Sequence, residues 1–178
     1  MWYIVQVETG REDAVANDIA AAASDVVDEC FVPRFRTGKR ASDGQWKPID
    51  ERLLPGYVIC STKQVNDVAD QLREVKGLTR ILGNDNAFIP LDDDERAWVQ
   101  RSTSRGQRTG GESVGYMEDG KLVVVDGPLV GREEWVAKVS HRKRLAFLEL
   151  PMGGRKVRAQ AGLRMVSKAQ GMQLLREK

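Results

Sequence analysis

The sequence has few of the side chains that most enzymes use for catalysis. Its 178 residues include one histidine, His141, and two cysteines, Cys30 and Cys60. His141 stands in the charged run HRKR, where we expect it to be solvated rather than paired with a cysteine. A Walker loop, a dinucleotide fingerprint and a G-x-S-x-G motif are also missing. We therefore expect a protein that is not an enzyme. The alternative is a cysteine-dependent enzyme, which needs a thiolate that reacts near neutral pH.

Donors for a metal site are equally scarce. With one histidine and no Cys-x-x-Cys, the sequence offers no zinc-binding set of the usual kind. Each cysteine is flanked by apolar residues, which favours two buried thiols over a disulfide. The acidic run Asp92–Glu95 has oxygens that could hold Mg²⁺, but acid at the start of a short helix is also a common cap. We expect no metal and no other cofactor.

Long apolar runs are missing as well. No run approaches the roughly 20 residues that a membrane-spanning helix needs, and the N-terminus lacks a basic stretch followed by an apolar one. These absences predict a cytoplasmic protein without a membrane partner. Hydrophobic residues make up 41% of the chain and charged residues 30%, which predicts a globular protein with one ordinary domain or two small ones.

Charge is unevenly distributed along the chain. Residues 1–100 carry 12 Lys and Arg against 18 Asp and Glu, a net charge of −6. Residues 114–178 carry 13 against 7, a net charge of +6, and residues 101–113 add +2. A weakly acidic front and a basic back indicate two bodies with different partners, the second partner being a polyanion. The alternative is a basic face that is merely solvated.

Hydrophobic periodicity predicts an α+β fold in the front body. Apolar stretches of strand character alternate with stretches in which apolar residues recur at helical spacing. Thr9 and Glu12 have the spacing of a capping box at the start of the first helix, and Pro33 marks an edge or a bulge in the second strand. The predicted strands are Met1–Val7, Glu29–Arg36, Tyr57–Ser61 and Leu78–Leu82, and the main predicted helices begin at Arg11 and Val65.

A polar segment separates this body from a β-rich one. Ser102–Ser113 contains no hydrophobic residue and is rich in Gly and Ser, which predicts a flexible linker. Beyond it, five short strands alternate with turns marked by residues such as Gly127, Pro128 and Gly131, a pattern typical of a small barrel. The predicted division is a front domain over 1–101, a linker over 102–113 and a barrel over 114–178.

The apolar run Leu53–Ile59 is interrupted by Pro55 and Gly56. Proline fixes φ and glycine tolerates positive φ, so the backbone must bend here. We expect the bend to leave Leu54 and Tyr57 uncovered while Val58 and Ile59 enter the core. An exposed Leu and Tyr pair is a candidate anchor for a partner's helix. The alternative is a kinked strand without a partner.

Basic side chains form the second candidate site. If their two segments are neighbours in the barrel, they make one patch for phosphate oxygens, with guanidinium groups that stack on unpaired bases. RNA fits better than DNA because no segment has the character of a recognition helix. We expect Arg142, Lys143 and Arg144 to be exposed, so that alanine there weakens RNA binding with little loss of stability. The candidates are Lys138, His141, Arg142, Lys143, Arg144, Arg155, Lys156 and Arg158.

Several of these segments together resemble the NusG family of transcription elongation factors. The opening WYIVQVETGRE, the LLPGYV turn, LTRILG followed by FIPL, the polar linker and the DGPLVG turn occur in the family's order over nearly the whole chain. Within the family, ECFVPRF, the GQW of the hairpin tip and the stretch from GPLVG to HRKRLAFLEL are similar to LoaP, a specialised antitermination paralogue.

The resemblance implies a fold and a set of partners. It implies an NGN-type α/β domain with an antiparallel sheet and flanking helices, and an SH3-like barrel with a KOW motif over about 121–144 that includes the turn at Gly127, Pro128 and Gly131. The NGN domain of a monomer would dock on the clamp helices of the largest subunit of RNA polymerase, and the barrel would bind a hairpin in the nascent leader RNA. The polymerase site carried over is Leu53, Leu54, Pro55, Gly56 and Tyr57.

Two alternatives stay open within the resemblance. Arg11, Arg73 and Arg80 are candidates for contact with upstream or non-template DNA, or are ordinary surface residues. A housekeeping NusG would use an apolar loop of the barrel to bind Rho or a ribosomal protein, and the corresponding loop here, PMGGRKVR, keeps only Met152 as a sizeable apolar residue. The expected function is processive antitermination, with the housekeeping role as the alternative.

Overall fold

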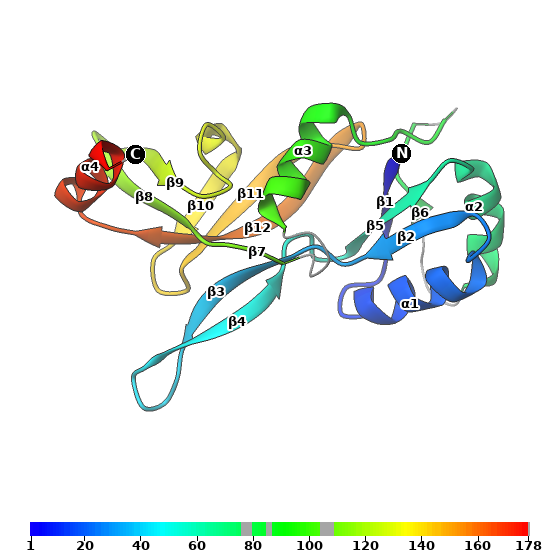
Figure 1. The fold of residues 1–178 in the computed structure, drawn as a ribbon, viewed down its shortest axis with the longest axis horizontal. Helices are drawn as coiled ribbons and strands as arrows, with labels where there is room; N and C mark the ends of the chain where they lie inside the picture. Colours follow the sequence, from blue (N-terminus) through cyan, green and yellow to red (C-terminus); the bar gives the residue numbers. More distant parts are fainter. Residues whose placement is uncertain (76–79, 85–86, 104–108, 178) are drawn as a thin grey trace. The chain divides into compact units, whose positions relative to one another are not determined.

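A computed structural model describes residues 1–75, 80–84, 87–103 and 109–177 (Figure 1). The chain forms two compact units, each assembled from segments that are separate in the sequence. The front unit is Met1–Pro33, Leu54–Val99 and Leu150–Val157, and the back unit is Arg34–Leu53, Gln100–Glu149 and Arg158–Lys178. The architecture is α+β, as predicted. The predicted domain ranges 1–101, 102–113 and 114–178 stay a prediction.

The front unit is built on a four-stranded sheet in the order β2-β5-β1-β6. The pairs β1–β5, β1–β6 and β2–β5 are all antiparallel, with Val5 opposite Val58 and Tyr3 opposite Cys60. Two helices pack on the sheet and bury residues at helical spacing, such as Val15 and Ile19, against Val58. The elements are β1 (Trp2–Gln6), α1 (Glu12–Ala22), β2 (Val27–Phe31), β5 (Tyr57–Thr62), α2 (Val65–Gln71), which continues as a 3₁₀ turn (Leu72–Glu74), and β6 (Arg80–Ile81).

One predicted strand, Glu29–Arg36, is divided in the structure, and another, Leu78–Leu82, is described only in part. The stretch predicted as one strand over Glu29–Arg36 is two strands, β2 and β3 (Arg34–Arg40), with Pro33 between them. Proline lacks the N–H that a continuing ladder needs, so a break rather than a bulge forms. The start of the strand predicted over Leu78–Leu82 lies outside the described residues.

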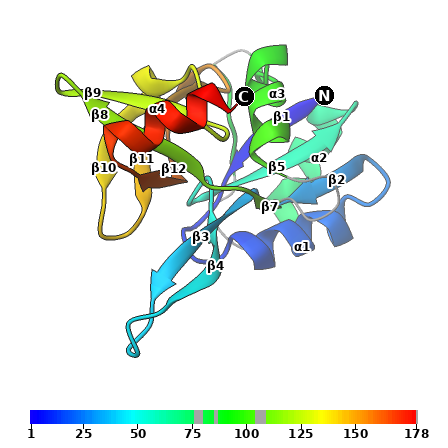
Figure 2. The ribbon, with the colours of Figure 1, turned by 60° about the vertical axis from the view of Figure 1, so that its left-hand side comes forward.

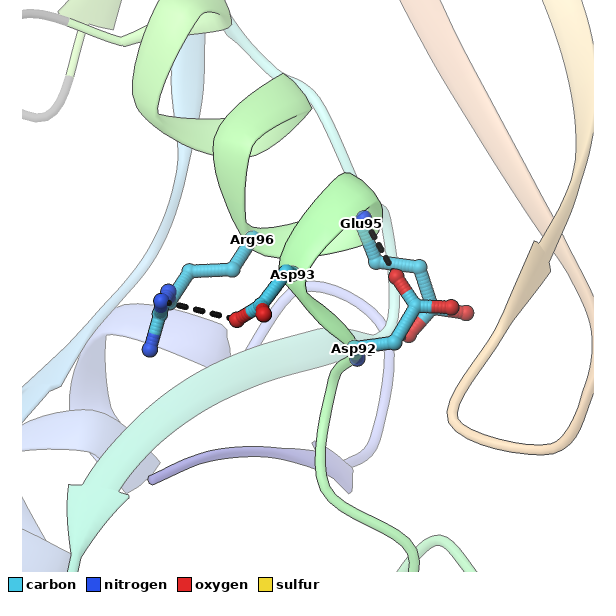
Figure 3. Close-up of polar contacts among 4 residues, drawn as sticks. All are labelled: Asp92, Asp93, Glu95 and Arg96. Atoms are coloured by element: carbon cyan, nitrogen blue, oxygen red, sulfur yellow. Dashed lines mark hydrogen bonds and ion pairs between the residues drawn. The ribbon is translucent and has the colours of Figure 1, made fainter.

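The acidic run at residues 92–95 caps a helix, α3 (Asp93–Ser102), as predicted (Figure 3). The Glu95 N–H donates to Asp92 Oδ1 at 2.7 Å, and the Asp92 N–H donates to Glu95 Oε2 at 2.9 Å. This reciprocal pair satisfies amide donors that the first turn of a helix leaves open. Arg96 forms an ion pair with Asp93 at 2.9 Å within the same turn. The acidic side chains therefore have a structural role that needs no metal.

The back unit combines a hairpin with the greater part of a five-stranded sheet, because Leu150–Val157, where β11 ends and β12 begins, belong to the front unit. The hairpin pairs β3 with β4 (Trp46–Arg52) in an antiparallel ladder, and β7 (Thr109–Gly110) adds to β3 in parallel. The five-stranded sheet has the order β10-β11-β12-β8-β9 and curls on itself (Figure 2). The five strands predicted for the barrel are all present: β8 (Ser113–Glu118), β9 (Lys121–Asp126), β10 (Val136–Ser140), β11 (Leu145–Met152) and β12 (Arg155–Met165).

Two features of the back unit differ from the sequence expectations. In the predicted linker 102–113, residues 104–108 lie outside the described residues, while Thr109–Gly110 form β7. A further helix, α4 (Lys168–Arg176), was not predicted; it packs on β8 and β9, with Gly171 against Tyr116 (Figure 2). Its signal was present, because Ser167 and Gln170 form a capping box.

Within the described residues, no helix is both long enough and apolar enough to cross a lipid bilayer. The same part of the chain holds no group of three or more His, Cys, Asp or Glu residues arranged to bind a metal ion.

Candidate nucleic-acid interface

The bend predicted at Pro55 and Gly56 is a tight turn. The Tyr57 N–H donates to the Leu54 carbonyl at 3.1 Å, and Gly56 has φ +83°. Proline at the second position and a positive-φ glycine at the third are the requirements of a type II turn. The sequence therefore predicted the backbone here correctly.

Glu12 holds this turn from helix α1. Its side chain is fully buried, and its carboxylate accepts the Gly56 N–H on Oε1 and the Gly10 N–H on Oε2, both at 2.8 Å. The capping box predicted for Thr9 and Glu12 is wrong, because Arg11 is the N-cap and its side chain makes no capping bond. The Glu12 carboxylate stabilises the fold more by accepting hydrogen bonds from two otherwise unsatisfied amides at the turn than it would by accepting one from an amide of its own helix.

The apolar residues of the turn are less accessible than predicted. Leu53 is 1% exposed and Leu54 is 0% exposed, so the expectation that Leu54 stays uncovered is wrong. Pro55 and Tyr57 are half-buried. The physical reason is that a tight turn keeps Leu54 next to the core instead of turning it outward, and burying a leucine is worth about 1.5–3 kcal/mol. Of the candidate anchors, Tyr57 is the one with accessible surface.

The basic run at residues 141–144 forms the turn between β10 and β11. His141, Arg142 and Lys143 are exposed, as predicted. Arg144 is half-buried rather than exposed. Its φ is +52°, a left-handed backbone conformation that residues other than glycine rarely adopt. Its carbonyl accepts hydrogen bonds from the Leu163 N–H at 2.9 Å and the Thr37 hydroxyl at 3.3 Å. Both bonds hold the turn in place within the back unit.

The side chain of Arg144 stacks on an aromatic ring of the β3–β4 hairpin. Its guanidinium carbon lies 3.8 Å from the centroid of the Trp46 ring, which is a close cation–π contact. Gly38 makes room for the ring, because a Cβ there would lie 2.9 Å from a Trp46 ring carbon. Trp46 keeps 39% of its surface exposed. Together, Trp46 and Arg144 form a flat platform that remains open to solvent.

A groove of about 710 Å³ runs beside this platform, and we call it the basic–aromatic groove. Its walls come from the β3–β4 hairpin on one side and from the β10–β11 turn with β11 on the other. Apolar side chains such as Phe147 and Ile49 line it together with Glu51, and cations stand at its rim. The main lining residues are Lys39, Arg40, Trp46, Arg142, Lys143 and Phe147.

Glu112 is a half-buried acidic residue close to Arg144 and Arg164. Burial raises the pKa of its carboxyl above the ordinary value, although the nearby charges of Arg144 and Arg164 act in the opposite direction. The Arg164 Nε lies 3.6 Å from Glu112 Oε2.

Only some of the predicted RNA-binding residues line the groove. Arg155 and Lys156 are exposed at the start of β12, in the front unit. Arg158 is exposed on β12, and Lys138 is exposed on β10 opposite Phe147. Of the predicted set, Arg142 and Lys143 line the groove, and Arg144 stacks on Trp46, which also lines it.

The turn after β9 contains the two glycines that were predicted to shape it, and both have positive φ. Gly127 has φ +92°, and a Cβ there would lie 2.5 Å from the Ser113 backbone. Gly131 has φ +71°. Pro128 lies between them and is half-buried, while Leu129 is fully buried and its N–H donates to the Ser113 hydroxyl at 3.1 Å. These residues shape the turn and carry no charge for a ligand.

The two thiols face each other across β2 and β5. Cys30 Sγ lies 2.9 Å from Cys60 Sγ, and both are free cysteines. The hydrogen bond with Cys30, together with burial, raises the pKa of the Cys60 thiol well above its ordinary value. Such a thiol is a poor nucleophile at neutral pH.

Comparison with known proteins places this chain among transcription factors. A family model described as "Transcription termination factor nusG" matches residues 1–100. The chain belongs to the NusG family. "Transcription termination/antitermination protein NusG" from Streptococcus pyogenes serotype M3 is 23% identical to this NusG-family protein over 157 residues, which cover 84% of this chain and 86% of that one. The protein of serotype M1 has the same identity and coverage.

A solved structure shows the same fold. The structure titled "Domain interaction in Thermotoga maritima NusG" covers 90% of this NusG-family chain, and 92% of its own chain is covered, with a TM-score of 0.51 at 16% identity. At this identity the similarity supports the α+β architecture.

The arginines suggested as DNA contacts of the NusG-family chain lie at different elements of the front unit. Arg11 forms an ion pair with Glu8 at 3.7 Å, and Arg73 forms one with Asp70 at 3.2 Å. Arg80 lies in β6 and shares a small cavity with Arg73. Their role in DNA contact stays a prediction.

Proposed function

We propose that this NusG-family protein is a processive antitermination and elongation factor that binds RNA polymerase through its front half and a leader RNA hairpin through its basic back half. The observation that carries the proposal is the exposed pair Arg142 and Lys143 on the β10–β11 turn. Residues 114–178 have a net charge of +6, and neither cation of this pair is in an ion pair within the described part of the chain. Free cations on a rigid turn suit phosphate oxygens. The stretch that runs from GPLVG through HRKRLAFLEL is similar to LoaP, and this similarity supports the same function.

The polymerase site is proposed at the Leu53–Tyr57 turn, directed at the clamp helices of the largest subunit. Tyr57 is the residue of this turn with aromatic surface left accessible. A factor that binds the closed clamp more tightly than the open clamp shifts the polymerase toward the processive state. Binding through one half also raises the local concentration of the other half near the emerging transcript.

A housekeeping role that couples polymerase to Rho or the ribosome is the second candidate. It is favoured by apolar surface in the back unit, where Met117 is 45% exposed and Val130 is 50% exposed. It is disfavoured at the loop suggested by the resemblance, because Met152 is 1% exposed and offers no apolar surface to a partner.

Replacing the exposed cations tests the RNA-binding half. Arg142→Ala with Lys143→Ala should weaken binding of the full chain to a fluorescent RNA stem-loop roughly tenfold, because phosphate contacts are lost. Both residues are exposed, so the thermal midpoint should not change. Lys121→Ala with Arg176→Ala removes the same charge elsewhere in the back unit and serves as the matched control. Equal affinity of the two double variants would contradict the proposed site.

A single substitution tests the polymerase half. Tyr57→Ala removes the accessible ring of the turn, so an immobilised variant should retain several-fold less RNA polymerase than the wild-type chain, as expected for the loss of an aromatic anchor. Retention that matches the wild type would remove this turn from the proposed site.

A further inference from the structure

The basic–aromatic groove extends the proposed RNA site onto residues of the β3–β4 hairpin. Lys39, Arg40 and Trp46 come from the hairpin, and Arg142 and Lys143 come from the β10–β11 turn. All five belong to the back unit, although the hairpin precedes the turn by about 100 of the chain's 178 residues. The sequence alone therefore gave no reason to treat these residues as one surface.

The groove is built around a rigid flat platform. Thr37 donates to the Arg144 carbonyl at 3.3 Å, and the Arg144 guanidinium lies 3.8 Å from the Trp46 ring centroid. Gly38, which follows Thr37 in β3, has no side chain, and the Trp46 ring occupies the space that a Cβ there would need. A platform fixed from both the hairpin and the turn loses little conformational entropy when a ligand binds.

The exposure of Trp46 is more than a packing role requires. Among the described residues, it is the one aromatic side chain that is both large and exposed, at 39%. Arg144 contacts the ring, yet much of its apolar surface faces solvent, and Phe147 lies in the same groove. Exposed aromatic surface beside cations is the arrangement that proteins use to stack unpaired bases.

The charges around the platform favour an anion. Lys39, Arg142 and Lys143 are exposed and form no ion pair within the part of the chain that the structure describes. Arg40 donates to the Gly44 carbonyl at 3.4 Å, and Glu51 is the acidic residue of the lining. Four cations against one carboxylate leave the groove basic, with its cations on both walls.

The size of the groove selects among RNA structures. A volume of about 710 Å³ lies within the range of roughly 300–1,000 Å³ typical of pockets for small ligands, and a double helix does not enter such a space. A paired base also presents its edges while its faces are covered by its neighbours. The groove therefore suits one or two unpaired nucleotides.

We propose that the basic–aromatic groove binds an unpaired nucleotide of RNA, with its base stacked on Trp46 and its phosphates between the cations of the hairpin and those of the β10–β11 turn. The proposal rests on the RNA-binding function proposed above. It adds that the protein distinguishes an unpaired loop from a plain duplex, and that the β3–β4 hairpin takes part in this distinction.

The test compares two RNA probes with the full chain. One is a stem-loop with unpaired loop nucleotides, and the other is a blunt duplex of the same stem. Trp46→Ala should weaken binding of the stem-loop about 5- to 150-fold, the usual effect of removing one stacking partner, and should leave duplex binding unchanged. Trp46→Phe keeps an aromatic face and should restore most of the affinity for the stem-loop. Lys39→Ala with Arg40→Ala should weaken binding of the stem-loop without altering the thermal midpoint.

The outcomes separate this inference from the proposed function. If Trp46→Ala and Lys39→Ala with Arg40→Ala both bind the stem-loop like the wild type, while Arg142→Ala with Lys143→Ala binds it weakly, the groove is wrong and the proposed function stands. Trp46→Ala could instead weaken binding of the stem-loop and of the duplex equally, with Trp46→Phe failing to restore the preference for the stem-loop. That result would show that no base stacks on Trp46, and the groove proposal would be wrong. If the wild-type chain binds neither probe at low salt, the proposed function fails, and the groove proposal fails with it.

Discussion

Arg144 is held through both its backbone and its side chain. Its φ of +52° is a conformation that costs about 1–3 kcal/mol for a residue other than glycine. Two hydrogen bonds to its carbonyl and the stack on Trp46 offset this strain. The consequence is that Arg142 and Lys143 project from a turn with a fixed geometry, so that their charges are presented to a ligand without reordering the backbone.

Glu112 gives the back unit a dependence on pH. Burial raises the pKa of its carboxyl, so the folded state binds this proton more tightly than the unfolded chain does. The stabilisation is complete below about pH 4.3, the usual pKa of glutamate, and is lost as the pH rises through the raised pKa. Glu112→Gln removes this titration. Its thermal midpoint should exceed that of the wild type at pH 7, and the difference should disappear near pH 4.

Thermal unfolding of the two proteins between pH 4 and pH 8 measures this difference. A lower midpoint for Glu112→Gln at pH 7 would show that the attraction of Arg144 and Arg164 outweighs burial, contrary to this account.

Among the elements, the turn at Pro55 and Gly56 depends on helix α1. Glu12 is fully buried and accepts two amide hydrogen bonds, one from Gly56 and one from Gly10. Glu12→Ala leaves both donors buried without their acceptor, which should lower the free energy of unfolding by about 3 kcal/mol. Denaturation in urea measures the change. Glu8→Ala, on an exposed side chain nearby, is the control, and an equal loss in both variants would contradict the role of Glu12.

Elements with local causes could be predicted from the sequence. The cap at Asp92 and Glu95 and the backbone bend at Pro55 and Gly56 follow from residues within four positions of each other, although Glu12 also holds the bend from helix α1. The five strands of the back unit follow from alternation between glycine-bearing turns. Helix α4 had a local signal as well, in the capping box of Ser167 and Gln170.

Elements with distant causes could not be predicted. The burial of Leu54 depends on what packs over the turn, which hydrophobic spacing does not reveal. The stack of Arg144 on Trp46 joins two turns that are far apart in the chain, and neither turn predicts the other. Whether the basic residues at 142–144 and at 155–156 are neighbours likewise depends on how distant parts of the chain pack, so their single patch stays a prediction.

At the scale of the whole molecule, charge is divided between the two halves of the sequence. The front hundred residues have a net charge of −6 and residues 114–178 have a net charge of +6, so the total of +2 is the sum of two segments of opposite charge and the +2 of residues 101–113. An acidic front avoids non-specific attraction to nucleic acid, and a basic back promotes attraction to RNA. This division fits a factor whose two halves bind different classes of partner.

The salt dependence of RNA binding tests the central claim most directly. Affinity of the full chain for the RNA stem-loop should fall linearly on a logarithmic plot against salt concentration, because each phosphate contact releases a counterion. The slope for Arg142→Ala with Lys143→Ala should be smaller by about 2 than the wild-type slope, one unit for each lost contact. Affinity that does not change with salt, or identical slopes for the two proteins, would contradict the claim that this turn binds the phosphates of a transcript.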